Sequence, residues 1–162
     1  MITEKEQLEC FQRGYRLYKR GNLGLALKNF QKAVDSNQSQ FNLREKDPLF
    51  ISFYGVSLAR VKGDTLTGRR LCETALRNGQ SYPEVFLNLG RVYEEMNEKI
   101  WAAETYRRGY RMHRDNLELL ESLQRVSPRE SVIPFLDRNN PLNKYAGKIL
   151  RRSPRPSRSP KA

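Results

Sequence analysis

The sequence predicts an all-α protein, an α-solenoid built of stacked helical hairpins. The main observation is a skeleton of small and large residues that recurs along the chain. Its copies are Gly14, Ala26, Phe30 and Ala33, then more weakly Gly68, Cys72 and Ala75, and finally Gly90, Ala102, Tyr106 and Gly109. Ala102 follows Gly68 by 34 residues, the period of a helix-turn-helix repeat. Gly68 follows Ala26 by 42 residues, which is the same period with eight residues inserted.

Local signals then predict each helix in order. Four places have the pattern of a helix start, in which a polar side chain accepts a hydrogen bond from a free backbone N–H group or a proline, which has no N–H, stands in the first turn. They are Thr3-x-x-Glu6, Asp47-Pro48, Ser81-x-x-Glu84 and Asp115-x-x-Glu118. Gly21, Gly63 and Gly79 can end the helices that precede them. The expected helices span residues 4–20, 23–36, 48–62, 65–78, 82–96, 99–113 and 116–126.

The small residues of the skeleton have a packing role in this prediction. Glycine or alanine at the point of closest approach lets two helix backbones come near the lower end of the usual separation of about 8 to 10 Å. Ala26, Phe30 and Ala33 are spaced four and then three residues apart, so they form one stripe along a helix. We interpret this stripe as packed core rather than as a cofactor site.

Over residues 3–126 the sequence resembles the tetratricopeptide repeat (TPR) family. The resemblance implies a TPR domain over residues 1–126, with repeats at about 7–40, 49–82 and 83–116 and a capping helix at 116–126. In the middle repeat one extra residue separates Gly55 from Gly63, so its register is open by one residue.

The resemblance also implies that the first helices of successive repeats line a concave groove that holds a segment of a partner protein. Aromatic side chains bury a large area at small entropic cost, and amide and guanidinium groups hold a partner's backbone or carboxylate. The groove residues expected on this basis are Phe11, Tyr15, Tyr18, Phe53, Arg60, Asn88 and Arg91. The alternative is that Phe11, Phe50 and Phe53 only close the interface between the first two repeats.

One TPR subtype clamps the carboxy-terminal carboxylate of chaperones with lysine, asparagine and arginine side chains. The matching places in this sequence hold Phe11, Tyr15, Tyr54, Glu84 and Asn88, so the resemblance does not extend to that clamp. We therefore expect an adaptor, a non-catalytic protein-interaction module, and keep a secretion-type chaperone as an alternative.

The formal net charge of +12 is concentrated at the carboxy terminus. Residues 151–162 contain no acidic and no large apolar side chain, so we expect a disordered tail that attracts polyanions. Its basic residues are Arg151, Arg152, Arg155, Arg158 and Lys161. A nucleic-acid- or ribosome-associated protein is therefore a further alternative. Residues 127–150 are too apolar for a linker, and we predict an extension that docks on the repeats, either as a cap on the last helix or in the groove.

Catalysis has little support in this sequence. His113 is the only histidine, and Cys10 and Cys72 fall at expected buried positions, where reduced thiols serve as small apolar groups. No phosphate-binding loop, metal-ligand cluster or nucleophile with a base is recognisable. We predict no enzymatic activity, no cofactor and no metal. The amino terminus lacks the apolar run of a signal peptide and no stretch is long enough for a membrane span, so we expect a cytoplasmic protein.

Overall fold

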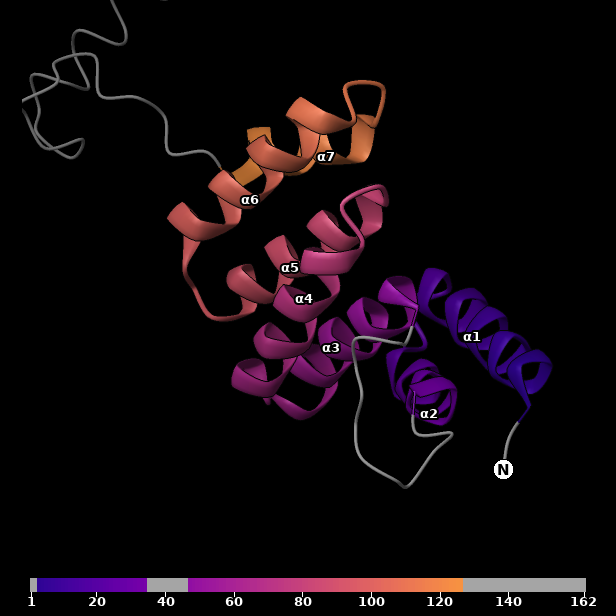
Figure 1. Ribbon diagram of the computed structural model, residues 1–162. Coiled ribbons are helices and arrows are strands. Elements are labelled where there is room, and N and C mark those ends of the chain that lie inside the picture. Colours follow the sequence, from indigo (N-terminus) through magenta and orange to yellow (C-terminus); the bar gives the residue numbers. More distant parts are fainter. Residues whose placement is uncertain (1–2, 35–46, 127–162) are drawn as a thin grey trace, which may run out of the picture. The chain divides into compact units, whose positions relative to one another are not determined.

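The computed structural model describes residues 3–34 and 47–126, and over these ranges it contains α-helices and no strand (Figure 1). The helices are α1 (Glu4–Lys19), α2 (Leu23–Val34), α3 (Pro48–Lys62), α4 (Thr65–Asn78), α5 (Pro83–Glu95), α6 (Lys99–Met112) and α7 (Leu117–Val126). The predicted all-α class is confirmed. Where an end is described, it differs from the predicted boundary by at most one residue. None of these helices has the length and apolar character needed to cross a membrane.

The predicted helix starts are confirmed in part. The Thr3 side chain accepts a hydrogen bond from the backbone N–H of Glu6, whose carboxylate accepts one from the Thr3 N–H at 2.7 Å. Asp47 accepts a hydrogen bond from the backbone N–H of Leu49 at 2.8 Å, ahead of Pro48 in the first turn of α3. Both arrangements satisfy donors that have no partner within the helix.

The other two predicted starts are wrong by one residue. At α5 the cap position is occupied by Tyr82, whose side chain makes no capping bond, because Pro83 begins the helix and Ser81 lies one place too early. At α7 the cap is Asn116 rather than Asp115, since the Asn116 side chain accepts from the backbone N–H of Leu119 at 2.9 Å.

Positive backbone φ angles end the first helices of the hairpins. Gly21 (φ 78°) follows α1 and Asn97 (φ 61°) follows α5. In both turns the next residue donates its backbone N–H to a carbonyl five residues earlier, from Asn22 to Leu17 and from Glu98 to Tyr93. This pattern satisfies carbonyls at the helix end and requires a left-handed residue, which glycine and asparagine adopt most readily. Gly63 (φ 70°) ends α3 in a similar conformation.

The helices stack in chain order as antiparallel pairs (Figure 1). α1 packs on α2, α3 on α4, and α5 on α6, and the second helix of each pair also contacts the first helix of the next. α3 contacts α5, and α5 contacts α7. The predicted α-solenoid is therefore confirmed over the described residues, with α7 packed against the last pair.

In each pair a glycine of the first helix lies against a side chain of the second helix. The contacts are Gly14 with Phe30, Gly55 with Cys72, and Gly90 with Tyr106. A methyl group at Gly90 would come within 2.2 Å of the Tyr106 ring, which is fully buried. Because Gly55 occupies the place of the other two glycines, these contacts settle the register of the middle pair.

This register changes which residues of α3 correspond to those of α1 and α5. Counting from Gly55, the residues of α3 equivalent to Phe11 and Tyr15 are Ser52 and Val56 rather than Phe53 and Ser57. The extra residue is accommodated at the end of α3, just before Gly63.

The predicted extension at 127–150 and the predicted tail at 151–162 lie outside the described residues, as do residues 35–46 of the segment that links α2 to α3. Both carboxy-terminal assignments stay predictions.

We expect Gly90→Ala to lower the free energy of unfolding by about 1 to 3 kcal/mol, because the added methyl group overpacks a buried ring. Gly24→Ala is the matched control, since a methyl group at this exposed position of α2 meets nothing within 4 Å. The control should be neutral or stabilising by up to about 1 kcal/mol, from helix propensity alone. Urea denaturation followed by circular dichroism measures the free energy of unfolding of both variants. Equal changes in the two variants would contradict the close contact between Gly90 and Tyr106 described above.

Candidate functional site

Every residue predicted for the partner-binding groove belongs to α1, α3 or α5. The side of the molecule formed by these helices and α7 is here called the odd-helix face. At its amino-terminal end, aromatic rings from three helices form one cluster. Its members are Phe11, Tyr15, Tyr18, Phe30, Phe50 and Phe53, here called the aromatic cluster.

Phe53 lies at the centre of the aromatic cluster. Its ring centroid is 5.3 Å from that of Tyr15 and 5.4 Å from that of Tyr18, both in edge-to-face geometry. It is also 5.7 Å from Phe11, which stacks on Phe50 at 4.3 Å. Aromatic pairs at these separations add about 0.5 to 1.5 kcal/mol each beyond the area they bury. The cluster therefore joins the first helix pair to the second.

Exposure divides the aromatic cluster into two layers. Phe53 is 3% exposed and Phe50 is 8% exposed, so these two rings belong to the core. Phe11, Tyr15 and Tyr18 are half-buried and form the outer layer on α1. The alternative was that Phe11, Phe50 and Phe53 only close the interface between the first two pairs. Phe50 and Phe53 are core residues there, and Phe11 stacks on Phe50 but stays half-buried, as do Tyr15 and Tyr18.

Two further residues extend the outer layer along α1. Leu8 is 47% exposed one turn before Phe11. The ammonium group of Lys19 lies over the Tyr15 ring, 5.6 Å from its centroid, in a cation–π arrangement.

A buried polar network crosses the middle of the odd-helix face. The Asn88 side chain is 0% exposed and donates to the Ser52 hydroxyl, which is also 0% exposed, at 3.2 Å. The Arg91 guanidinium donates to the side-chain amide oxygen of Asn88 at 3.1 Å and to the Tyr18 hydroxyl at 3.5 Å. Because buried polar groups are costly when unpaired, this network holds α1, α3 and α5 in one arrangement.

Ion pairs link the later helices of the face. Arg60 of α3 pairs with Glu95 of α5 at 3.2 Å. Arg91 of α5 pairs with Glu118 of α7, and Arg125 of α7 pairs with Glu94 of α5 at 2.9 Å; these three contacts are here called the inter-helix ion pairs. They connect each odd helix from α3 onward to the next.

Glu94 also accepts a hydrogen bond from the Tyr106 hydroxyl. Burial of the phenol, followed by this bond and the charge of Glu94, raises the pKa of Tyr106 above its ordinary value. Nearby, burial and then the charge of Glu73 raise the pKa of Tyr93 to about 12. Both tyrosines are therefore held in the neutral form.

The structure brings the predicted site residues together in two groups. Phe11, Tyr15, Tyr18 and Phe53 meet in the aromatic cluster, and Tyr18, Asn88 and Arg91 meet in the polar network. Arg60 lies apart, in its ion pair.

Sequence reasoning missed Ser52, Glu95 and Glu118, each of which contacts a predicted residue. The signal for Ser52 was the register given by Gly55. No sequence pattern pointed to Glu118, because its contact with Arg91 depends on where α7 packs against α5.

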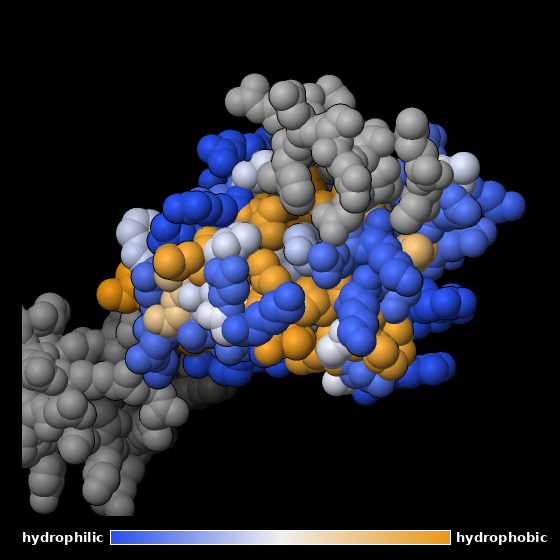
Figure 2. All heavy atoms as spheres, turned by 90° about the horizontal axis from the view of Figure 1, so that it is seen from below, coloured by the Kyte–Doolittle hydropathy of each residue, from blue (hydrophilic) through white to orange (hydrophobic). Residues whose placement is uncertain are grey.

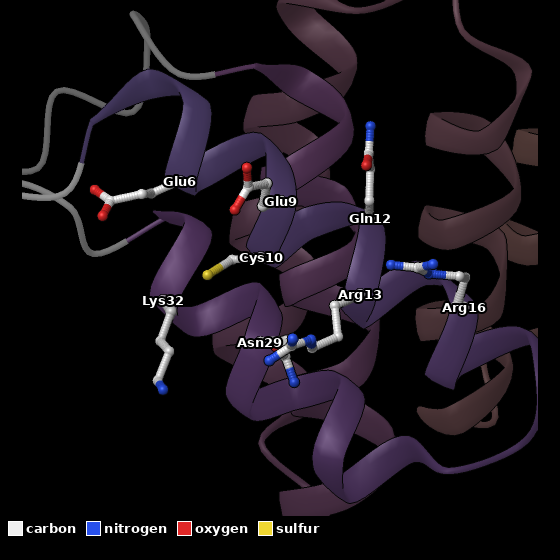
Figure 3. A pocket seen from close by; sticks show the side chains of 8 residues that line it. All are labelled: Glu6, Glu9, Cys10, Gln12, Arg13, Arg16, Asn29 and Lys32. Atoms are coloured by element: carbon white, nitrogen blue, oxygen red, sulfur yellow. The ribbon is translucent and has the colours of Figure 1, made fainter.

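An open depression of about 490 Å³ lies between α1 and α2 (Figure 3). Its walls include Glu9, Gln12 and Arg16, which are exposed. The equivalent positions of α5 include Val85 and Val92, which are fully buried against the preceding helices. Polar residues at these places mark the end of a stack of repeats, so we interpret the depression as a solvated end face.

Figure 2 shows hydrophobic patches bordered by hydrophilic residues on one side of the molecule. Among the described residues, large apolar side chains are also exposed near the start of the second helix of a pair. Ile100 is 77% exposed and Trp101 is 60% exposed. The Trp101 ring stacks on Tyr93 at 6.4 Å, and the Tyr93 hydroxyl donates to Glu73 at 3.2 Å.

The remaining candidate groups for chemistry have structural contacts. His113 lies with its Nε2 atom 2.8 Å from the Gln80 carbonyl oxygen. The Cys72 thiol is fully buried, donates to the Ser52 carbonyl oxygen at 3.4 Å, and has a pKa raised by burial. Over residues 3–34 and 47–126, no group of three or more histidine, cysteine, aspartate or glutamate residues could hold a metal ion.

Comparison with known proteins rests on structure. No protein-family model matches the sequence, and neither does any curated protein. Among solved structures, the first TPR domain of human RPAP3 is similar, with 18% identity, a TM-score of 0.61, and coverage of 77% of this chain and 92% of that one.

Two further structures contain bound peptides. The first TPR of Spaghetti (RPAP3) bound to the HSP90 peptide SRMEEVD has 17% identity and a TM-score of 0.58, over 78% of this chain and 94% of that one. The second TPR domain of human RPAP3 with the HSP70 peptide SGPTIEEVD has 12% identity and a TM-score of 0.58, over 78% and 100%. At these identities the likeness establishes the fold, and the chain has the TPR fold predicted from the sequence.

The raised pKa values of Tyr93 and Tyr106 predict a loss of stability at alkaline pH. An ordinary tyrosine ionises near pH 10, so the stabilising contribution is complete below that pH. For Tyr93 it should be lost as the pH rises from about 10 to about 12, because the unfolded state then releases a proton that the folded state retains. Urea denaturation at pH 8, 10 and 11 measures the effect.

Tyr93→Phe and Tyr106→Phe should each reduce this dependence on pH. Tyr82→Phe is the control, since Tyr82 is 40% exposed and outside both hydrogen bonds. A pH dependence that is identical in all three variants would contradict the assignment.

Proposed function

We propose that this chain is a protein-interaction module that binds a segment of a partner protein along the odd-helix face. The observation that carries the proposal is the outer layer on α1: Leu8 is exposed, and Phe11, Tyr15 and Tyr18 are half-buried over a closed core. Two neighbours with the same fold hold chaperone peptides, which supports a peptide as the partner.

The proposed contacts follow from exposure. Leu8, Tyr15 and Tyr18 contact the partner directly. Leu8 is exposed, and the half-buried rings of Tyr15 and Tyr18 are already ordered by their contacts with Phe53. Pre-ordered aromatic side chains lose little entropy on binding, which makes them effective anchors. Phe53 and Asn88, which we predicted as groove residues, are buried and support the binding surface from the core. Phe53 contacts Tyr15 and Tyr18, and Asn88 accepts a hydrogen bond from Arg91.

The partner segment is apolar at this end of the face. The peptides of the two neighbours, SRMEEVD and SGPTIEEVD, carry acidic residues. In this chain the first odd helix offers aromatic and aliphatic side chains, and the ammonium group of Lys19 lies over the Tyr15 ring. A segment with leucine, phenylalanine or similar side chains fits these groups best. As part of the same proposal, the chain is a non-catalytic adaptor of the cytoplasm.

Binding can be tested by selecting peptides from a random 12-residue phage library on the full chain. We expect Leu8→Ser and Tyr15→Ser each to weaken the selected peptides about 5- to 30-fold, which corresponds to about 1 to 2 kcal/mol. Fluorescence anisotropy measures the affinities, and circular dichroism confirms that each variant is folded.

Leu25→Ser is the matched control for the selection. Leu25 is exposed to the same 47% as Leu8 but lies on α2, away from the odd-helix face. The control should change affinity less than 2-fold, a change of about 0.4 kcal/mol. An equal loss of affinity in Leu8→Ser and Leu25→Ser would contradict binding at α1. Unchanged affinity of the selected peptides for Leu8→Ser and Tyr15→Ser would contradict it as well.

A further inference from the structure

The arginines of the inter-helix ion pairs differ in burial. The Arg91 side chain is 22% exposed, whereas those of Arg60 and Arg125 are 37% and 59% exposed. Of these three arginines, Arg91 therefore interacts most strongly with a neighbouring anion, because water screens its charge least.

The Arg91 guanidinium is held in a fixed orientation. Its Nη1 atom donates to the Asn88 and Tyr18 oxygens, and its Nη2 atom points to the carboxylate of Glu118. A guanidinium whose other side is already hydrogen-bonded is well prepared to bind one carboxylate. In this structure the chain itself supplies that carboxylate.

We propose that Glu118 acts as a built-in anion that excludes acidic segments from the odd-helix face. Its carboxylate occupies the position that a partner's carboxylate would take at Arg91, and its negative charge repels an acidic segment that approaches. Glu94 and Glu95 neutralise Arg125 and Arg60 in the same way on either side. The inference rests on the proposed function and specifies the charge of the partner segment, which is uncharged or basic where it passes α5.

Stability alone would be a different role for Glu118. Its side chain is 46% exposed, and exposed ion pairs contribute little to folding. Removing the charge while keeping the shape of the side chain, as in Glu118→Gln, should therefore leave the fold intact and free the guanidinium of Arg91. Affinity for an anionic probe distinguishes this exclusion from a purely structural contact.

The probe is fluorescein-labelled tetraglutamate, and its affinity for the full chain is measured by anisotropy at about 150 mM salt, where contacts with distant charges are screened. We expect Glu118→Gln to bind the probe about 5- to 10-fold more tightly than the unmodified chain, the effect of freeing one charge-assisted hydrogen bond. Circular dichroism and a melting curve verify that the variant is folded.

Two controls make this result specific. Glu121→Gln changes the net charge by the same amount on an exposed residue of the same helix and should alter affinity less than about 2-fold. Adding Arg91→Gln to Glu118→Gln should abolish the tightening. The inference is overturned if the unmodified chain and Glu118→Gln bind the probe with equal affinity. It is also overturned if Glu121→Gln tightens binding as much as Glu118→Gln, or if the double variant with Arg91→Gln still binds more tightly.

This outcome is separate from that of the peptide selection. The tetraglutamate measurement depends on Arg91 and α7, whereas the selection depends on Leu8 and Tyr15 of α1. A face that binds apolar peptides through α1 while Glu118→Gln has no effect would refute the exclusion alone. Tighter probe binding by Glu118→Gln, with no peptide selected through α1, would refute only the proposed function.

Discussion

Close approach of the two helices in each pair is the constraint on which the rest of the structure depends. At Gly90 the missing Cβ leaves room for the ring of Tyr106, which crosses beneath α5 and becomes fully buried. Its hydroxyl then reaches Glu94, and Glu94 pairs with Arg125 of α7. One backbone contact therefore positions a core ring and, through its hydroxyl, a carboxylate on the odd-helix face that also contacts α7.

The odd-helix face has two parts with different physical character. Around α1 it consists of half-buried aromatic rings that contact the buried ring of Phe53. From α3 to α7 its arginines are paired with glutamates of the neighbouring helix. Under the proposed function, binding energy for an apolar segment comes mainly from the first part, where burial releases water from apolar surface. The arginines of the second part are neutralised within the chain, and in our proposal this part selects against acidic segments.

Much of the fold could be predicted because its signals are local or periodic. Thr3 and Asp47 cap helices through neighbouring residues, and the 34-residue spacing of Gly68 and Ala102 reports a repeat directly. Errors of one residue arose where Pro83 sets the start of a helix and displaces Ser81 from the cap. The candidate site was harder to predict, because exposure and pairing depend on contacts between residues far apart in the chain.

The sequence by itself determined the helices, their order and the stacked-hairpin fold, because capping acts within one turn and the repeated spacing of small residues reports the stacking directly. Only the tertiary structure decided that Phe53 and Asn88 are buried, that Ser52 supports Asn88, and that Arg91 meets Glu118. The physical reason is that register and side-chain pairing are set when helices pack. A shift of one residue along α3 turns a side chain from the surface into the core.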